Sequence, residues 1–293
     1  MHVVISIPAF NEEATIGKVI SDIKYTMENT DYKYKVLVVD DGSTDKTAVI
    51  AKKSGAIVFS HPRNYGLAET FRTELQKCLD LKADIIVHTD ADGQYRAEDI
   101  PKLLHEIRKG YDLVLGDRFT GGIQFMPLIK RCGNRAFSRI ISHIIKYKVN
   151  DCQTGFRAFT REVAEKVKII SSHSYTQEQI IRAVKQKFKI KEVPVIFLKR
   201  KDKSRLISNP FEYAFKAWIN ILRIYRDYEP LKFFGIIGSI FLGLGLILGV
   251  WLFSLYLRFG EVGHYPTIML AVLLLISGVQ ISIFGFFADM HKK

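Results

Sequence analysis

Two long stretches near the carboxyl end of the chain carry no charged side chain, and they constrain the fold more than any other feature. Residues 233–257 and 265–288 contain no Asp, Glu, Lys or Arg. Each stretch exceeds the roughly 20 residues that a helix needs to cross a bilayer. Together they explain why hydrophobic residues reach 48% of the chain. The sequence therefore predicts two transmembrane helices, with a pair of buried core helices as the alternative.

The segment 258–264 between the stretches is too short for a domain, so the helices are expected to form a hairpin with both chain ends on one side. The hairpin loop has a single basic residue, Arg258. The basic residues on the side of the chain ends include Arg223, Arg226, Lys232, Lys292 and Lys293. The positive-inside rule then predicts an integral membrane protein whose termini and large amino-terminal part are cytoplasmic.

Two further features fit a reducing, cytoplasmic compartment. Met1 and His2 run directly into a strand-like segment, so no signal peptide is expected. Cys78, Cys132 and Cys152 are odd in number and lack metal-site spacing. Structural disulfides and a zinc site are therefore not expected.

Before these stretches the chain alternates short β-branched runs with helical segments, which is typical of an α/β domain with a largely parallel sheet. The expected strands are 2–8, 35–40, 56–59, 85–89, 112–116, 154–159 and 190–197. The expected helices are 14–28, 44–54, 67–81, 97–109, 127–147 and 175–186. Polar or glycine-rich clusters follow the first five strands. Because ligands bind at the carboxyl ends of strands in open α/β sheets, we expect these clusters to line one crevice.

The cluster after the apolar run 85–87 contains Asp90, Asp92 and Gln94. Two carboxylates on a tight turn supply the hard oxygen ligands that Mg²⁺ or Mn²⁺ prefers, and such a metal can bridge a diphosphate. A D-x-D pair alone is weak evidence, because such pairs also occur in solvated turns and helix caps. The preceding strand, Gln94 and a second acidic pair elsewhere strengthen the interpretation as a metal site.

The second acidic pair, Asp40 and Asp41, follows another strand and precedes Ser43 and Thr44, which are good helix caps. The pair is either a capped turn or a site where a carboxylate accepts hydrogen bonds from a nucleobase or ribose. The first strand is not followed by G-x-G-x-x-G, and G-x-x-x-x-G-K-[ST] is absent. These absences argue against a dinucleotide-binding dehydrogenase and a P-loop NTPase. A nucleotide would instead be held by carboxylates and a metal.

The net charge of +13 suits nucleic acid, an anionic membrane surface or phosphate-bearing substrates. The basic residues are not interleaved with stacking aromatics as in RNA-binding sheets, and the membrane segments favour the other two partners. No nucleic-acid partner is therefore expected. Residues 209–228 mix apolar side chains with Lys216, Arg223 and Arg226 at helical spacing. They predict a helix in the membrane interface, with an ordinary amphipathic helix as the alternative.

Five motifs, in this order, resemble those of the family 2 glycosyltransferases that make dolichyl- and polyprenyl-phosphate sugars. They are Ile7-Pro8-Ala9-Phe10-Asn11-Glu12, Val38-Val39-Asp40-Asp41-Gly42-Ser43, Asp90-Ala91-Asp92-Gly93-Gln94, Gly116-Asp117-Arg118 and Gln153-Thr154-Gly155-Phe156-Arg157. The resemblance covers essentially the whole chain, because some members of that family have two carboxyl-terminal membrane helices. It implies a GT-A nucleotide-sugar-binding domain at 1–207, a juxtamembrane amphipathic segment at 208–231, and a transmembrane hairpin with a short cytoplasmic tail at 232–293.

The resemblance also implies roles for individual residues. The nucleotide sugar is implied to contact Pro8, Phe10, Glu12, Asp40, Asp41 and Asp90. Its diphosphate is implied to carry Mg²⁺ or Mn²⁺ held by Asp90, Asp92 and Gln94. The acceptor phosphate is implied to contact Arg118, Lys130, Arg131, Asn134, Arg135, Arg200, Ser204 and Arg205. The implied catalytic residues are Asp92, Arg118, Lys130 and Arg131, and the implied sugar contacts are Gln153, Thr154 and Glu178, with a structural role for Glu178 as an alternative.

Two departures from the family pattern leave individual roles open. Many relatives carry arginine three residues after the proline, where this chain has Lys130 followed by Arg131. Many also have a glycine beside a serine-lysine-leucine sequence after the last strand, and the segment 203–206 lacks that glycine. Either Lys199 or Arg200 then faces the phosphates. The whole basic run 199–205 is alternatively a solvated or lipid-headgroup face.

Segments 173–178 and 226–231 resemble archaeal enzymes that load the first sugar of an N-glycan onto dolichyl phosphate. This favours a UDP-linked hexose or N-acetylhexosamine donor over GDP-mannose. A phosphate acceptor is mostly unprotonated at pH 7, because its second pKa lies near 6 by analogy with phosphoserine. No general base is therefore expected, and single displacement would invert the anomeric centre.

Two other functions are alternatives. A processive polysaccharide synthase shares the nucleotide-binding half but uses a Q-x-x-R-W element, and neither Trp218 nor Trp251 follows an arginine. A non-catalytic membrane scaffold on the same fold is opposed by the intact Asp90 and Asp92. The expected partners are a nucleotide diphosphate sugar, dolichyl or polyprenyl phosphate and the lipid bilayer, and the sequence is compatible with a homo-oligomer.

Overall fold

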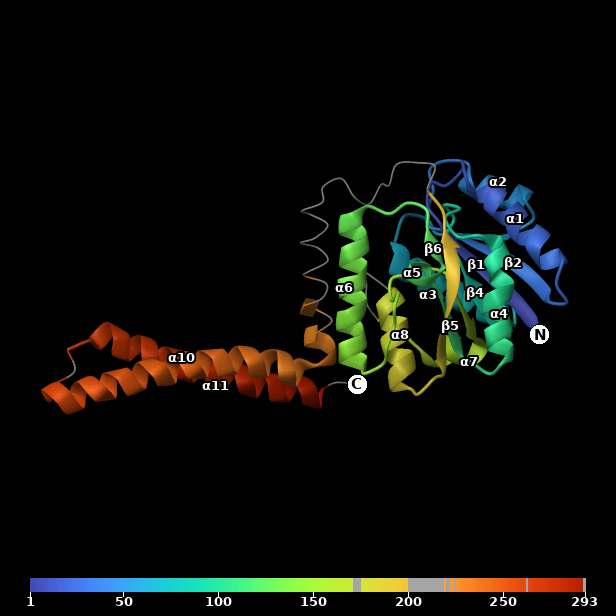
Figure 1. Ribbon diagram of the computed structural model, residues 1–293. Coiled ribbons are helices and arrows are strands. Elements are labelled where there is room, and N and C mark those ends of the chain that lie inside the picture. Colours follow the sequence, from blue (N-terminus) through green and yellow to red (C-terminus); the bar gives the residue numbers. More distant parts are fainter. Residues whose placement is uncertain (171–174, 200–218, 220–221, 224, 262, 292–293) are drawn as a thin grey trace. The chain divides into compact units, whose positions relative to one another are not determined.

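A computed structural model confirms the expected alternation of strands and helices (Figure 1). It describes residues 1–293 apart from 171–174, 200–218, 220–221, 224, 262 and 292–293. The chain divides into two compact units, Met1–Ser208 and Asn209–Lys293. The strands are β1 (His2–Ala9), β2 (Lys33–Asp40), β3 (Ile57–Ser60), β4 (Ile85–His88), β5 (Leu113–Asp117), β6 (Gly122–Ile123), β7 (Arg157–Thr160) and β8 (Ile190–Phe197). The helices of the first unit are α1 (Ile16–Glu28), α2 (Thr47–Lys53), α3 (Leu67–Asp80), the 3-10 helix η1 (Ala97–Asp99), α4 (Ile100–Arg108), α5 (Arg118–Gly121), α6 (Leu128–Ile145), α7 (Arg161–Lys166) and α8 (Tyr175–Lys185).

Within the described residues, the strands form one mixed sheet in the order β3-β2-β1-β4-β7-β5-β8-β6. Neighbouring strands run parallel except for β7, which is antiparallel to both β4 and β5. The loops after β1, β2, β4 and β5 therefore leave the sheet at one edge. The segment that enters β7 reaches the same edge, because this strand runs the opposite way. Its register places Arg157 opposite His88.

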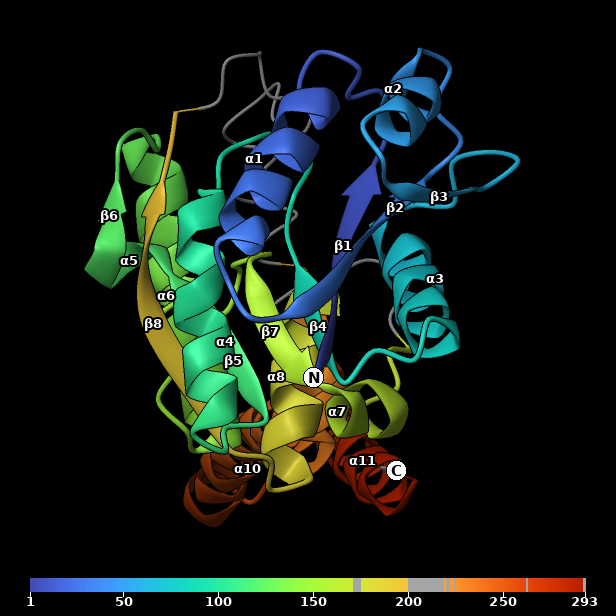
Figure 2. The same ribbon diagram turned by 90° about the vertical axis from the view of Figure 1, so that its right-hand side faces the viewer.

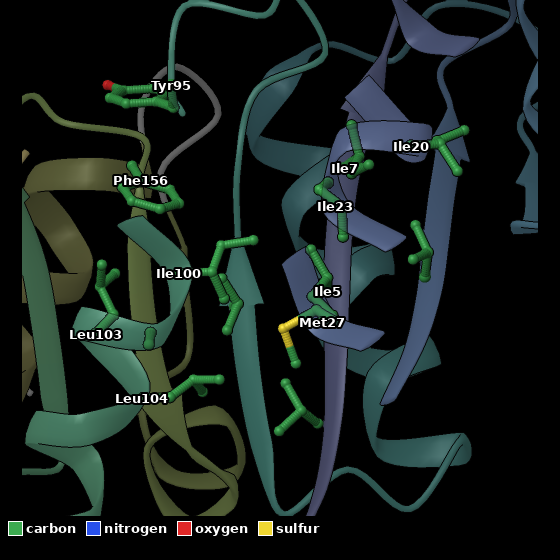
Figure 3. Packing of buried hydrophobic residues seen from close by; sticks show 14 of the residues in the cluster. Ile5, Ile7, Ile20, Ile23, Met27, Tyr95, Ile100, Leu103, Leu104 and Phe156 are labelled. Atoms are coloured by element: carbon green, nitrogen blue, oxygen red, sulfur yellow. The ribbon is translucent and has the colours of Figure 1, made fainter. Parts of the chain in front are cut away.

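Helices α1 and α4 cover one face of the sheet, and α3, α6 and α8 cover the other (Figures 1 and 2). The buried residues of α1 recur at helical spacing and form one apolar stripe: Ile16, Ile20, Ile23 and Met27. Figure 3 shows side chains of this stripe near Ile5 and Ile7 of β1, with Ile100, Leu103 and Leu104 of α4 in the same cluster. Alternation along the strands directs Ser6 of β1 and His88 of β4 to the opposite face, where α3 and α8 lie.

Some elements differ from the expectation at their edges. The helix expected at 97–109 is divided into η1 and α4, and Pro101 lies in the first turn of α4, where its missing N–H is not needed. The strand expected at 154–159 begins only at Arg157, because Thr154 and Gly155 bond to Tyr95 and not to a neighbouring strand. The elements α5, β6 and α7 were not expected, since they are too short to create a periodic pattern.

The second unit contains a hairpin of α10 (Pro230–Phe259) and α11 (Tyr265–Met290), and each helix is long and apolar enough to cross a membrane. Glycine allows the two helices to approach closely, because a Cβ added at Gly278 would lie 2.9 Å from the Gly238 carbonyl oxygen. Buried small residues recur every seven positions, at Gly238 and Gly245 of α10 and at Ala271, Gly278 and Gly285 of α11. This spacing keeps one stripe of each helix in contact with its neighbour. Most of the interface helix expected at 209–228 lies outside the described residues.

Candidate active site

The turn after β4 presents the two carboxylates of the expected metal site. Gly93 adopts a φ of +72°, a left-handed conformation that a glycine accepts without strain. Asp92 Oδ1 accepts a hydrogen bond from the Gln94 backbone N–H at 3.0 Å. The Asp90 carboxylate accepts no hydrogen bond from any residue that the structure describes. It lies against Gly155, where an added Cβ would be 2.8 Å from Asp90 Oδ1, so this glycine makes room for the carboxylate.

The donor atoms of this turn suit Mg²⁺ or Mn²⁺. Carboxylate oxygens are hard ligands, and Mg²⁺ is commonly bound by one or two carboxylates together with substrate phosphates. Over the described ranges of the chain, no group of three or more His, Cys, Asp and Glu side chains is arranged to enclose an ion. Two carboxylates would leave a bound metal with positions for phosphate oxygens. Gln94 Nε2 donates to the Leu198 carbonyl at 3.1 Å, so Oε1 is the atom of Gln94 that could ligate.

Tyr95, the residue after Gln94, holds this turn in place through its ring and its hydroxyl group. Its ring stacks on Phe156, with centroids 5.1 Å apart, and both rings are seen in Figure 3. Its hydroxyl oxygen accepts a hydrogen bond from the Gly155 N–H at 3.2 Å. Burial raises the pKa of Tyr95 to about 12, although the nearby Arg118 opposes this shift. The hydroxyl is therefore neutral at physiological pH, and it joins the turn after β4 to the segment that enters β7.

A cavity of about 260 Å³ lies between α1 and the Asp92–Tyr95 turn. The charged residues that line it are largely paired with one another, as Lys18 with Asp22 at 2.5 Å and Arg96 with Glu98 at 3.1 Å. Such a cavity offers little uncompensated positive charge to a diphosphate. Asp92 itself lines the cavity, so the cavity adjoins the expected metal site.

The Asp41 carboxylate is bonded within the protein. It is 4% exposed, and its Oδ1 is 2.8 Å from His61 Nδ1 and accepts from the Tyr65 N–H at 2.9 Å. Its Oδ2 accepts from the Gly66 N–H at 2.9 Å. Asp40 is also buried, and its Oδ1 accepts from the Ser43 N–H at 3.2 Å. Asp41 therefore ties the loop after β3 to the end of β2, and its contact with a nucleoside stays a prediction.

The loop after β1 carries Pro8, Phe10 and Glu12, and it is fastened to the loop after β2. The Thr44 N–H donates to Asn11 Oδ1 at 2.8 Å, and the Glu12 N–H donates to Thr47 Oγ1 at 2.8 Å. Phe10 is 38% exposed despite its apolar ring. An exposed aromatic ring on a braced loop at the ligand edge of the sheet is suited to stacking on a nucleobase.

Arg118 follows β5 and forms a buried, bidentate ion pair. Its Nε and Nη2 donate to Asp151 at 2.5 and 2.8 Å, and its guanidinium lies over the Phe197 ring at 5.0 Å. Burial acts to lower the pKa of Arg118, but the neighbouring Tyr95 hydroxyl and the Asp151 and Asp90 groups outweigh it, and the net shift is upward. Arg118 thus stays charged, close enough to Asp90 to interact with it electrostatically, but its charge is largely compensated by Asp151.

Helix α6 carries the remaining cations expected to meet the acceptor phosphate. Arg131 Nε is buried and has no hydrogen-bond partner among the described residues. Arg135 is exposed, with its guanidinium 5.1 Å from the Phe119 ring centre, while Asn134 is buried and Lys130 is half-buried. Arg200, Ser204 and Arg205 lie outside the described residues. The acceptor role of all these residues stays a prediction.

The three expected sugar contacts have different settings. Thr154 is fully buried, and its hydroxyl is 3.4 Å from the Tyr95 hydroxyl. Gln153 is half-buried beside Asp151, to which its N–H donates at 3.3 Å. The Glu178 carboxylate accepts from the Ile170 N–H at 3.0 Å and from Arg182 Nε at 2.7 Å. These bonds fit the structural alternative for Glu178, and its contact with the sugar stays a prediction.

Three residues of the site were not expected from the sequence: His61, Tyr95 and Asp151. His61 directly follows β3, as the expected clusters follow their strands, so its position was a usable signal. Tyr95 directly follows the expected metal ligands. Asp151 gave no signal, because it comes from the loop after α6 and meets Arg118 only through folding.

A family model described as "Glycosyl transferase family 2" matches residues 4–168 of the chain. The dolichyl-phosphate hexose transferase of Haloferax volcanii is 36% identical to this chain over 69% of the chain and 84% of the relative. The UDP-N-acetylglucosamine--dolichyl-phosphate N-acetylglucosaminyltransferase of Methanococcus voltae is 33% identical over 64% of the chain and 82% of the relative. Glucosyl-3-phosphoglycerate synthase from Mycobacterium tuberculosis, crystallised with Mn²⁺, UDP and phosphoglyceric acid, matches with a TM-score of 0.61 at 21% identity, covering 76% of this chain and 77% of that chain. This last likeness concerns the fold.

Proposed function

The chain belongs to glycosyl transferase family 2 and has a GT-A fold, and from this premise we propose that it transfers a sugar from a nucleotide diphosphate sugar to dolichyl or another polyprenyl phosphate. Two relatives more than 30% identical bear names with dolichyl phosphate as a substrate. The observation that carries the proposal is the Asp90 carboxylate, which has no hydrogen-bond partner in the described part of the chain and lies close enough to Arg118 to interact with it electrostatically.

Asp90, Asp92 and Gln94 would hold Mg²⁺ or Mn²⁺ against the donor diphosphate. The metal would supply charge stabilisation for the nucleoside diphosphate as it leaves. The protein contributes the fixed direction of the Asp90 carboxylate, which rests against Gly155, and the braced turn that carries Asp92. Pro8, Phe10, Glu12, Asp40 and Asp41 would form the nucleoside side of the donor site, with Phe10 as the exposed stacking surface.

The acceptor phosphate would bind at the cations around α6. Arg131 is a strong candidate, because its buried Nε has no partner among the described residues and a phosphate oxygen would satisfy it. Lys130, Asn134 and Arg135 lie within one turn of it on α6. Arg118 shares its charge with Asp151, so we assign it to aligning the phosphate and not to neutralising it alone. Gln153 would border the sugar.

The reaction needs no general base in this proposal. At pH 7 most of the phosphate monoester is already unprotonated, since its second pKa lies near 6. Arg131 and Arg118 would hold one of its oxygens behind the anomeric carbon, opposite the leaving diphosphate. A single displacement then forms the new carbon–oxygen bond as the old one breaks, which inverts the anomeric centre. The internal bonds of Glu178 support a structural role for this carboxylate and not that of a base.

For the donor we propose a UDP-hexose or UDP-N-acetylhexosamine, with GDP-mannose as the competitor, because one relative is named for UDP-N-acetylglucosamine. The two apolar helices α10 and α11 would anchor the chain in the bilayer. We place the catalytic domain, residues 1–207, and both termini on the cytoplasmic side, following the distribution of basic residues around the hairpin.

The test is a product assay with the full chain in detergent micelles. The protein is incubated with Mn²⁺, dolichyl phosphate and each of a panel of UDP- and GDP-sugars, and the lipids are analysed by mass spectrometry. We expect one sugar to appear on the lipid phosphate with UDP sugars favoured. Dolichol without phosphate is the matched acceptor control. Equal use of dolichol as acceptor would overturn the acceptor assignment. A rate that excess EDTA leaves unchanged would overturn the metal assignment.

A further inference from the structure

A buried polar cluster lies directly behind Asp90, on the face of the sheet that α3 and α8 cover. Its members are Glu74 of α3, His88 of β4, Arg157 of β7 and Tyr175 of α8. Each of these side chains is at most 1% exposed. Burying so many polar groups is costly unless they are bonded to one another. The cluster lies close to the expected metal site, because His88 ends β4 two residues before Asp90 and Tyr175 is near enough to Asp90 to interact with it electrostatically.

Hydrogen bonds connect three of these residues in a chain. Glu74 Oε2 is 2.8 Å from His88 Nδ1, and His88 Nε2 is 2.6 Å from the Tyr175 hydroxyl. The Tyr175 ring also stacks on Phe71 of α3, with centroids 4.0 Å apart. The chain therefore joins α3, β4 and α8, and it fixes the rotation of the Tyr175 ring.

Arg157 connects this chain to the loop beside Asp90. Its guanidinium lies 5.4 Å from the centre of the Tyr175 ring. Its Nη1 donates to the Thr176 carbonyl at 3.1 Å and to Gln179 Oε1 at 2.8 Å, and its Nη2 donates to the Thr154 carbonyl. Burial lowers the pKa of Arg157. The guanidinium thus fastens the first turn of α8 to the segment that enters β7.

The same segment contains Gly155, against which the Asp90 carboxylate rests. The antiparallel register pairs His88 with Arg157, and continuing it by two residues brings Asp90 beside Gly155. An added Cβ at Gly155 would lie 2.8 Å from Asp90 Oδ1, so a small shift of this backbone would move or release the carboxylate. Thr154 and Gly155 have a second attachment through the Tyr95 hydroxyl, at 3.4 and 3.2 Å.

From this geometry we propose that Glu74, His88, Tyr175 and Arg157 are positioning residues that hold the Thr154–Gly155 backbone in place and thereby aim the Asp90 carboxylate at its metal. The inference rests on the proposed function, in which Asp90 ligates Mg²⁺ or Mn²⁺. All four residues are buried, so we assign them no direct contact with a substrate or the metal. They act as the outer partners of a metal ligand, whose loss typically costs about 10- to 100-fold in metal affinity or activity.

The experiment uses the substitution Tyr175→Phe in the full polypeptide chain. This variant keeps the ring stacking on Phe71 and removes only the hydroxyl that is bonded to His88. Mn²⁺ is titrated in the presence of UDP, and the free ion is measured by electron paramagnetic resonance. We expect the Kd for Mn²⁺ to rise by about 10-fold, kcat to fall by a similar factor, and KM for the acceptor to stay unchanged. Hydrogen exchange at residues 153–157 should become faster.

Tyr147→Phe is the matched control, because the Tyr147 hydroxyl also makes one hydrogen bond, to the Ile190 carbonyl at 2.8 Å, at the opposite end of the sheet. This variant should leave the Kd for Mn²⁺ and the exchange at 153–157 within about twofold of the wild type. The positioning role would be overturned if Tyr175→Phe left the Kd for Mn²⁺ unchanged, or changed it no more than Tyr147→Phe does.

The wild type and Asp92→Asn separate this inference from the proposed function. If the wild type binds Mn²⁺ no better than Asp92→Asn does, the metal assignment itself is wrong. In that case hydrogen exchange alone tests whether the buried cluster holds the loop in place. Unchanged protection at residues 153–157 in Tyr175→Phe would overturn this role of the cluster. Arg157→Lys is a second variant that keeps the charge but cannot bond both carbonyls, and it should raise the Kd for Mn²⁺ at least as much.

Discussion

The ends of β2 and β4 look alike in sequence, since each strand has an acidic pair at or just beyond its last residue, yet the carboxylates of the two pairs are bonded differently. The Asp41 carboxylate meets His61 and two backbone N–H groups and is 4% exposed. The Asp90 carboxylate has no such bond to any described residue. A bonded, buried carboxylate holds loops together, whereas an unbonded one at a ligand edge is available to a cation. The hydrogen-bond partners of a carboxylate, and not its residue type, thus distinguish a structural residue from a candidate metal ligand.

The largest effect is expected at Asp90. Asp90→Asn removes a charged metal ligand and leaves no internal donor without its acceptor, so turnover should fall by about 10²- to 10³-fold while the melting temperature stays nearly constant. Product formation measured by mass spectrometry and a thermal melt check the two halves of this prediction. Asp22→Asn is the control, because Asp22 is an exposed carboxylate paired with Lys18. A variant that unfolds would show that Asp90 resembles Asp41 after all.

The opposite response is expected at Asp41. Asp41→Ala leaves two backbone N–H groups and His61 without their acceptor, so the unfolding free energy should fall by about 2–4 kcal/mol. Chemical denaturation of the detergent-solubilised chain measures this. Asp40→Ala serves for comparison, because the Asp40 carboxylate accepts one hydrogen bond from the described residues, that of the Ser43 N–H, and its loss should cost less stability. An Asp41 variant as stable as the wild type would remove the contrast between the two loops.

Gly155→Ala sharpens the account of Asp90 by displacing its carboxylate without removing it. The new Cβ would lie 2.8 Å from Asp90 Oδ1, so we expect activity to fall by about 10-fold through misdirected metal binding. Gly116→Ala is the control, since its Cβ would lie 3.0 Å from Phe156 and Val195 and crowd the core instead. If both variants lose stability and activity in parallel, crowding alone explains the result.

The smallest effect is expected at Glu178, a third carboxylate that is bonded within the protein. Glu178→Gln keeps an acceptor for the Ile170 N–H, so the rate should stay within about threefold of the wild type and the acid limb of the pH profile should not move. Steady-state kinetics between pH 5 and 9 measure both. Loss of turnover with intact donor and acceptor binding would make Glu178 a base and overturn the base-free mechanism.

Much of the fold followed from the sequence because its elements have strong local patterns. The apolar stripe of α1 recurs at helical spacing, and the β-branched runs of β1 and β4 are short and almost continuously buried, so local patterns located all three. One exception is the start of β7, where the Gly155 N–H bonds to the Tyr95 hydroxyl, a partner sixty positions away along the chain. The antiparallel direction of β7 was likewise not visible in its residues, since direction depends on how the chain returns to the sheet.

For the site, the residues alone specify which chemical groups are present: the carboxylates Asp90 and Asp92 on a turn, the cations of α6, and two helices apolar enough for a bilayer. The folded chain specifies which of these groups are bonded to other protein groups. The sequence did not indicate the partners of Arg118 and Asp41: folding brings Asp151 to 2.5 Å from the Arg118 guanidinium, and it brings His61 and the loop after β3 to the Asp41 carboxylate. The physical reason is that a charged group's function depends on its uncompensated charge and lone pairs, and these are set by partners that are distant in sequence and close in space.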